Sequence, residues 1–96
     1  MPPRFRLGRL YATPGAVNLL EQLNVSPLVL LARHASGDWG DLGVSDRDAN
    51  EQAVADGGRL LSAYTLADRA RVWVITEAAD EAGERACTTV LLPEEY

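Results

Sequence analysis

The sequence is poor in the side chains that build redox and metal centres. Its 96 residues contain one cysteine and one histidine, Cys87 and His34. A single cysteine excludes an internal disulfide and a thiolate zinc cluster, and in an apolar strand we expect it to be a buried, inert thiol. The aspartates at positions 38, 41, 46 and 48 lack the order of an EF-hand calcium loop. We therefore expect no metal site and, because no Gly-rich nucleotide loop occurs, no cofactor.

Long hydrophobic runs are also missing. The longest apolar stretch, Pro27 to Ala32, is about a third of the roughly 18 residues that a membrane-spanning helix needs. The N-terminus carries Arg4, Arg6 and Arg9 without the apolar segment of a secretion signal. With 47% hydrophobic and 24% charged residues, the composition is that of a folded protein with one core. The sequence thus predicts a single domain, residues 1–96, in the cytoplasm and away from membranes.

Lysine is absent, and the charge is unevenly distributed. All nine basic residues are arginines, the net charge is −5, and the first twenty residues hold three arginines and no acid. Residues 37–58, in contrast, hold six acids against Arg47 alone. A negative total argues against sequence-independent nucleic-acid binding, which depends on neutralising phosphates. The same balance suits an acidic face that binds a basic surface on a protein partner.

Two helix-start signals of the same kind follow an N-terminal strand. The strand is predicted over Phe5–Ala12, where apolar and charged residues alternate. Thr13-Pro14 and Ser26-Pro27 each combine a capping hydroxyl with a proline at the first helical position, where its missing N–H costs nothing. They predict helices over Pro14–Leu23 and Pro27–Ser36, and the short link between them predicts that the second folds back against the first.

The second half of the chain changes from helical to strand periodicity. Ser45 opens a third, polar helix, in which Ser45 and Asp48 approximate a capping box and Gly57 is the stop. From there the period is two, which predicts three strands over Arg59–Leu66, Arg71–Ala78 and Ala86–Leu92. The expected fold class is α+β: an N-terminal strand, two to three helices and a three-stranded antiparallel meander (β-α-α-α-β-β-β), with the helices packed on one face of the sheet.

The most unusual stretch is an acidic, Gly-rich turn around a tryptophan, Gly37 to Leu42. The indole and the carboxylates that follow it are candidates for a binding surface, with Asp38, Trp39, Asp41, Asp46, Asp48 and Glu51 as its residues. The alternative is that the indole folds onto the domain to anchor the loop, while the acids make local Asx-turn hydrogen bonds. Both interpretations remain open from the sequence alone.

His34 is the only side chain whose ordinary pKa lies near neutrality, so general acid–base chemistry would begin there. A ribonuclease needs a base, an acid and a cation for the developing charge. The catalytic candidates are His34, Arg59, Tyr64 and Glu77, although no spacing ties them together. Possible partners in such chemistry are Asp38, which could orient the ring or bind Arg33, the strand hydroxyls of Ser62, Tyr64, Thr76 and Thr88 or Thr89, and Arg71. The alternative is a structural histidine that caps its helix or bonds a backbone carbonyl.

The C-terminal stretch Leu91–Tyr96 combines an apolar strand end with two acids and a terminal tyrosine. Pro93 cannot donate a hydrogen bond to a strand ladder, so it should end the last strand. The tail is then either a solvated end or a docked segment. If it is docked, Tyr96 closes over the sheet.

Four segments carry a family resemblance: Ala32–Gly40, Arg59–Tyr64, Val72–Glu77 and Thr88–Tyr96. Together they resemble a family of small proteins carried on bacterial plasmids and integrative elements, over nearly the whole chain. The family offers no catalytic residues to transfer, and its setting implies a role in the contest between mobile elements and hosts. The predicted element order is also similar to that of RelE and barnase-like ribonucleases, although RelE-type toxins are usually strongly basic.

Two functions follow as hypotheses. The first is a non-enzymatic protein-binding module of a mobile element. Its acidic face around Asp38 to Asp56 would occupy a basic, nucleic-acid-handling surface, in the manner of anti-restriction or anti-CRISPR counter-defence. The alternative is a metal-independent endoribonuclease of the RelE or barnase type, with His34 as general acid or base. A homodimer paired through an exposed strand edge is a third option.

Overall fold

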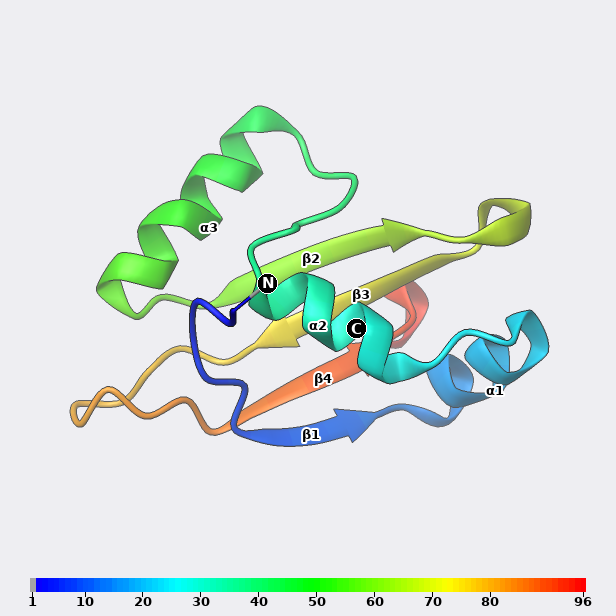
Figure 1. Cartoon of the computed structure of the whole chain (residues 1–96), viewed down its shortest axis with the longest axis horizontal. Coiled ribbons are helices and arrows are strands. Elements are labelled where there is room, and N and C mark those ends of the chain that lie inside the picture. Colours follow the sequence, from blue (N-terminus) through cyan, green and yellow to red (C-terminus); the bar gives the residue numbers. More distant parts are fainter. Residues whose placement is uncertain (1) are drawn as a thin grey trace.

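A computed structural model describes residues 2–96, which form three helices and one four-stranded sheet (Figure 1). The predicted α+β class and the predicted order of the elements are confirmed. The elements are β1 (Arg9–Ala12), α1 (Pro14–Leu23), α2 (Pro27–Ala35), α3 (Val44–Asp56), β2 (Leu60–Thr65), β3 (Arg71–Thr76) and β4 (Cys87–Leu91), with 3-10 turns at Ala67–Arg69 and Pro93–Glu95. Within residues 2–96, no single helix has the length and apolarity to cross a membrane; only α1 and α2 taken together, with a 106° bend between them, pass that test.

The sheet is mixed, with strand order β1-β4-β3-β2. Strands β2, β3 and β4 form the predicted antiparallel meander. The prediction was incomplete, however, because β1 joins the same sheet and runs parallel to β4, with Arg9 opposite Cys87 and Ala12 opposite Val90. The period of a strand does not report its partner or direction, so this non-local pairing could not be read from the pattern.

The first strand begins four residues later than predicted, at Arg9 instead of Phe5. Gly8 explains the difference, because its φ of 68° turns the backbone out of the extended conformation. A Cβ at Gly8 would lie 2.4 Å from the carbonyl oxygen of Arg85, so only glycine fits there. The residues before Gly8 leave the sheet, and Phe5 packs against the rings of His34 and Trp39.

The first two helices begin where the sequence predicts. The Thr13 hydroxyl accepts a hydrogen bond from the amide of Ala16, and the Ser26 hydroxyl accepts one from the amide of Leu28. Asn24 ends α1 in the left-handed conformation, and α2 ends at Ala35, one residue earlier than predicted. The chain turns through 106° between these helices, so α2 does not run back along α1 but crosses one face of the sheet (Figure 1).

The third helix starts differently from the prediction. Its N-cap is Gly43, which has no capping side chain, so the expected Ser45–Asp48 capping box does not form. Within this helix Ala49 is exposed, whereas Asn50 is buried. The predicted stop is confirmed, because the following residue, Gly57, has a left-handed φ of 86°. Only Asn50 and Ala53 of this helix are buried, so α3 presents most of its surface to solvent.

The main core lies between α1, α2 and one face of the sheet. Alternate residues of β3 point into it, and Val72 and Val74 are completely buried. A second, smaller cluster joins Trp39 to Ala53 of α3 and Leu60 of β2. The main cluster consists of Ala16, Leu20, Leu30, Leu31, Tyr64, Val72, Val74 and Val90.

The C-terminal tail docks on the other face of the sheet. The Tyr96 ring lies 5.7 Å from the Trp73 ring in an edge-to-face arrangement, and the Arg59 guanidinium lies 5.0 Å from the Tyr96 ring centroid. These residues border an apolar cavity of about 270 Å³. Cys87, which we expected to be buried, is only half-buried because it stands at the start of β4.

Candidate functional site

His34 lies at the centre of a buried chain of hydroxyl groups. Its side chain is completely buried, with Nδ1 2.6 Å from Ser62 Oγ and Nε2 2.8 Å from Thr76 Oγ1. Thr76 Oγ1 is in turn 2.7 Å from Thr88 Oγ1, and the Thr88 hydroxyl donates to the carbonyl of Leu7. Three of the hydroxyls considered from the sequence therefore belong to this chain, Ser62 and Thr76 in direct contact with the histidine and Thr88 through Thr76.

The hydrogen bonds of this chain fix the tautomer of His34. Each hydroxyl has one proton, and that of Thr88 is donated to Leu7, so the Thr76 hydroxyl must donate to Thr88. Thr76 then accepts from Nε2–H of His34, and the Ser62 hydroxyl donates to Nδ1. Every polar atom of the imidazole is satisfied in its neutral form.

Burial keeps His34 uncharged. Desolvation lowers the pKa of His34 from 6.5 to about 4, and the positive charge of Arg85 lowers it further in the same direction. At neutral pH the ring is uncharged, and it has no contact with solvent. His34 therefore has the environment of a structural histidine, although its partners are side-chain hydroxyls and not the backbone carbonyl that the second interpretation of the sequence named.

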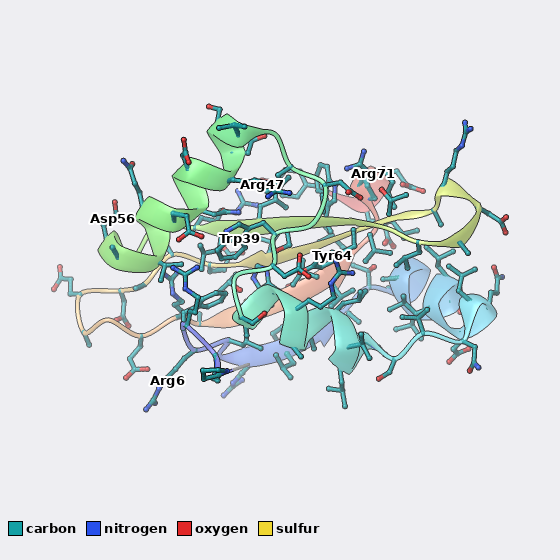
Figure 2. All side chains as sticks on the ribbon, turned by 45° about the horizontal axis from the view of Figure 1, so that its top comes forward. Arg6, Trp39, Arg47, Asp56, Tyr64 and Arg71 are labelled. Carbon is teal, nitrogen blue, oxygen red and sulfur yellow. The ribbon has the colours of Figure 1, made fainter. Side chains whose placement is uncertain are left out.

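The other catalytic candidates do not gather around His34. Tyr64 is buried beside α2; its hydroxyl donates to the carbonyl of Asp38, and burial raises its pKa to about 12 (Figure 2). Arg59 lies on the opposite face of the sheet, against Tyr96. Glu77 is exposed just beyond the end of β3. Only His34 and Tyr64 share a face, so the structure does not assemble the acid, base and cation of a ribonuclease.

Trp39 anchors its loop instead of presenting the indole to solvent. It is 4% exposed, and its ring stacks on Phe5 and meets His34 edge-on. The indole N–H donates to Glu51 Oε2 at 2.9 Å. Arg4 holds the same carboxylate with two hydrogen bonds of 2.9 and 2.8 Å. These bonds from Arg4 and Trp39 lower the pKa of Glu51 to about 2, so Glu51 serves the internal structure.

The two aspartates beside Trp39 are also engaged internally. Asp38 pairs with Arg33 Nε at 2.7 Å and accepts from the amide of Gly40, and the bond from Arg33 lowers its pKa. Asp41 accepts from the amide of Thr65 at 3.1 Å, which lowers its pKa as well. Of the six candidate binding residues, Asp38, Asp41, Trp39 and Glu51 therefore stabilise the corner itself.

This corner closes the outer edge of β2. The side-chain amide of Asn50 makes hydrogen bonds to both the N–H and the C=O of Leu61. Two residues further along, Ala63 donates to the carbonyl of Trp39 and accepts from the amide of Asp41. Together with the bond from Thr65 to Asp41, these contacts occupy three successive outward-facing positions of the strand. The edge is thereby blocked for pairing with another strand.

The remaining candidates, Asp46 and Asp48, are exposed on α3. Within residues 2–96 the structure contains two ion pairs, Arg4–Glu51 and Arg33–Asp38, and neither involves these aspartates. Arg47, the one cation on α3, instead donates to the carbonyls of Leu42 and Gly40. Beside them Val44 is 76% exposed. We call Val44, Asp46, Asp48 and Asp56 the α3 surface.

Sequence reasoning missed Arg85, which is buried and donates to three carbonyls. Its guanidinium reaches Gly58 O at 2.7 Å, Ala53 O at 3.0 Å and Glu77 O at 3.0 Å. These bonds join the C-terminal end of α3 to the end of β3, and burial lowers the pKa of Arg85. The residues that surround Arg85 in the sequence do not distinguish a buried arginine from a solvated one. A cavity of about 480 Å³ lies beside it, between the N-terminal segment and the β3–β4 loop.

Comparison of the chain with known protein families, with curated proteins and with solved structures gave no match. The resemblance to plasmid-borne proteins and the topological similarity to RelE-type ribonucleases therefore remain predictions. Across residues 2–96 the structure has no group of three or more His, Cys, Asp or Glu side chains that could hold a metal ion.

Proposed function

We propose that this protein is a non-enzymatic binding module that engages a basic protein surface through the α3 surface. The observation that carries the proposal is the exposure of the Asp46 and Asp48 carboxylates. Both carboxylates are exposed, and in the described part of the chain neither is paired with a cation. Their charges are therefore free to act on a partner.

The construction of α3 supports this role. Only two of its residues are buried, so the helix contributes little to the core and much to the surface. The exposed Val44 lies one helical turn before Asp48 and supplies apolar contact next to that charge, a combination typical of protein–protein interfaces. Arg47 is held by backbone carbonyls and, in the described residues, makes no ion pair with its acidic neighbours.

The partner class follows from the charge. An acidic helix on a protein of net charge −5 is attracted to clustered arginines and lysines. Surfaces of that kind hold nucleic acid in many proteins, so we propose a nucleic-acid-handling protein as the partner, in the counter-defence setting that the family resemblance implies. The ribonuclease alternative gains no support, because His34 is buried, neutral and fully hydrogen-bonded.

Charge reversal on α3 tests the proposal. Tagged protein carrying Asp46→Lys with Asp48→Lys should capture at least about ten-fold less of its partner from a bacterial host lysate than the parent chain. Asp41 is left unchanged, because its carboxylate closes the β2 edge. Asp46 is the acid in the first turn of α3, where its loss costs only about 0.3–1 kcal/mol, and Asp48 is exposed and makes no ion pair in the described residues, so the variant should stay folded.

A matched control carries Glu81→Lys with Glu84→Lys, the same change in net charge on the exposed β3–β4 loop. Capture should survive in the control and should weaken for the parent chain as salt rises. Equal losses in both variants would mean that net charge alone matters, and retention in both would mean that α3 is not the contact surface.

A further inference from the structure

The two edges of the sheet differ in whether other segments cover their free backbone groups. The β2 edge is closed by Asn50, Trp39 and Asp41, as described above. At the other edge lies β1, all four residues of which are exposed. Among residues 2–96, β1 therefore carries the one sheet edge that no other segment covers.

The free hydrogen-bonding groups of β1 belong to Leu10 and Ala12. Arg9 and Thr13 donate to the carbonyls of Ala86 and Val90, so the odd-numbered residues face β4. Because strand residues alternate, the N–H and C=O groups of Leu10 and Ala12 point away from the sheet. Two exposed apolar side chains accompany them, Leu10 at 50% and Tyr11 at 52%.

The two ends of the β1 edge also carry opposite charges. Its N-terminal end carries Arg6 and Arg9, and no acid occurs in the first twenty residues. At its C-terminal end the Thr13 hydroxyl and the Gly15 amide donate to the carboxylate of Glu95, which hydrogen bonding keeps ionised by lowering its pKa. A strand that pairs antiparallel with an identical strand places the basic end of each copy against the acidic end of the other.

We propose that two copies of this chain pair antiparallel through β1, which joins their sheets into one continuous sheet about a two-fold axis. With Tyr11 opposite Tyr11 of the second copy, Leu10 and Ala12 exchange backbone hydrogen bonds across the axis. Arg9 then lies opposite Thr13 of the other copy and beside its Glu95. Pro14 has no N–H, so the ladder stops there.

Helix α2 adds apolar surface to this contact. It packs against β3 and lies over β3 and β4, on the face of the sheet toward which Leu10 points (Figure 1). Its exposed residues include Leu28 at 66% and Val29 at 55%, and the helix carries no charge before Arg33. A two-fold axis perpendicular to the sheet brings both copies of α2 to the same face, where these side chains flank the seam.

The dimer also goes beyond the proposed binding function, because α3 packs against β2 at the opposite end of the sheet. Pairing through β1 leaves both α3 surfaces free at the two ends of the assembly. Two binding surfaces on one body raise the effective affinity for a partner that presents two basic sites.

Mass measurement of the full chain in solution, by sedimentation equilibrium over a range of concentrations, tests the proposal. The parent chain should reach twice its monomer mass. Leu10→Lys should raise the dimer dissociation constant at least about ten-fold, since a lysine on an edge opposes strand pairing. Val44→Lys is the matched control on α3, and it should remain dimeric.

Arg9→Glu provides a second variant that leaves the apolar residues in place, so the proposal stays testable if Leu10→Lys fails to fold. It should weaken the dimer about ten-fold, because a carboxylate at position 9 would face Glu95 of the other copy, which carries the same charge. A parent chain that stays monomeric at every concentration would overturn the proposal. Dissociation by Val44→Lys with no effect of the β1 variants would also overturn it.

Discussion

Lowering the pH from 6.5 to 4 is expected to reduce the free energy of unfolding by about 3 kcal/mol, because of His34 alone. In the unfolded chain this histidine takes up a proton near its ordinary pKa of 6.5, whereas in the folded chain it does so only near about 4. The unfolded state therefore binds more protons between these values. The contribution is complete above pH 6.5 and is lost as the pH falls through the folded pKa.

The acidic groups act in a different pH range. Hydrogen bonds from Arg4 and Trp39 lower the pKa of Glu51 from 4.5 to about 2, so its contribution is present above pH 4.5 and is lost as the pH falls toward 2. The loss between pH 6.5 and 4.5 can therefore be attributed to the histidine.

Urea unfolding at pH 7, 5.5 and 4.5 checks this prediction, with His34→Gln as the control. Glutamine retains a donor and an acceptor but does not titrate, so its stability should be nearly constant over this range. At pH 7 the variant should be less stable by about 2 kcal/mol, because it cannot satisfy both Ser62 and Thr76 with the geometry of the ring. Parallel pH profiles for the two proteins would contradict the buried, neutral histidine.

Gly40→Ala is the substitution with the second large expected effect, a loss of about 3 kcal/mol of stability. Gly40 has a left-handed φ of 75°, and a Cβ there would lie 2.1 Å from the carbonyl oxygen of Ala63. Alanine would force the loop away from β2 and break its bridge to Ala63. The melting temperature should fall by roughly 15 °C, measured by circular dichroism.

Gly43→Ala is the matched control three residues along the same loop. Its φ is −70°, and a Cβ there meets no atom within 4 Å, so the change should cost less than about 1 kcal/mol. Similar melting temperatures for both variants would mean that the corner around Trp39 does not close the β2 edge as described.

The local features of the fold could be predicted because they depend on neighbouring residues. In Thr13-Pro14 and in Ser26-Pro27 the hydroxyl residue caps the helix, and the proline, which has no N–H, occupies its first position. Both helices begin there. The three C-terminal strands follow from their period of two. The predicted start of α3 was wrong because the chain uses Gly43 as the N-cap, two residues before the predicted Ser45, and glycine needs no side-chain bond to fill that position.

Features that join distant residues could not be predicted. The parallel pairing of β1 with β4 joins residues nearly eighty positions apart, for example Arg9 and Cys87. In the same way, the sequence did not separate the acidic candidates that are held internally from those that are not. Glu51 is held by Arg4, 47 residues away, and Asp41 by Thr65, 24 residues away. Sequence spacing does not tell which carboxylates are engaged internally and which remain free on α3.

The structure divides the original site hypothesis into two parts with separate roles. Trp39, Asp38, Asp41 and Glu51 hold the corner together and close one edge of the sheet. The α3 surface stands outside that network. Under the proposed function, a protein partner would contact α3 without disturbing the buried core around His34.

Photo-crosslinking in living host cells tests the central claim most directly. A benzoylphenylalanine introduced at Ser45, an exposed position of α3, should form a covalent adduct with a protein partner on irradiation. The same group at Gln22, an exposed position of α1, should form none. Adducts from position 22 only, or equal adducts from both positions, would contradict recognition through α3.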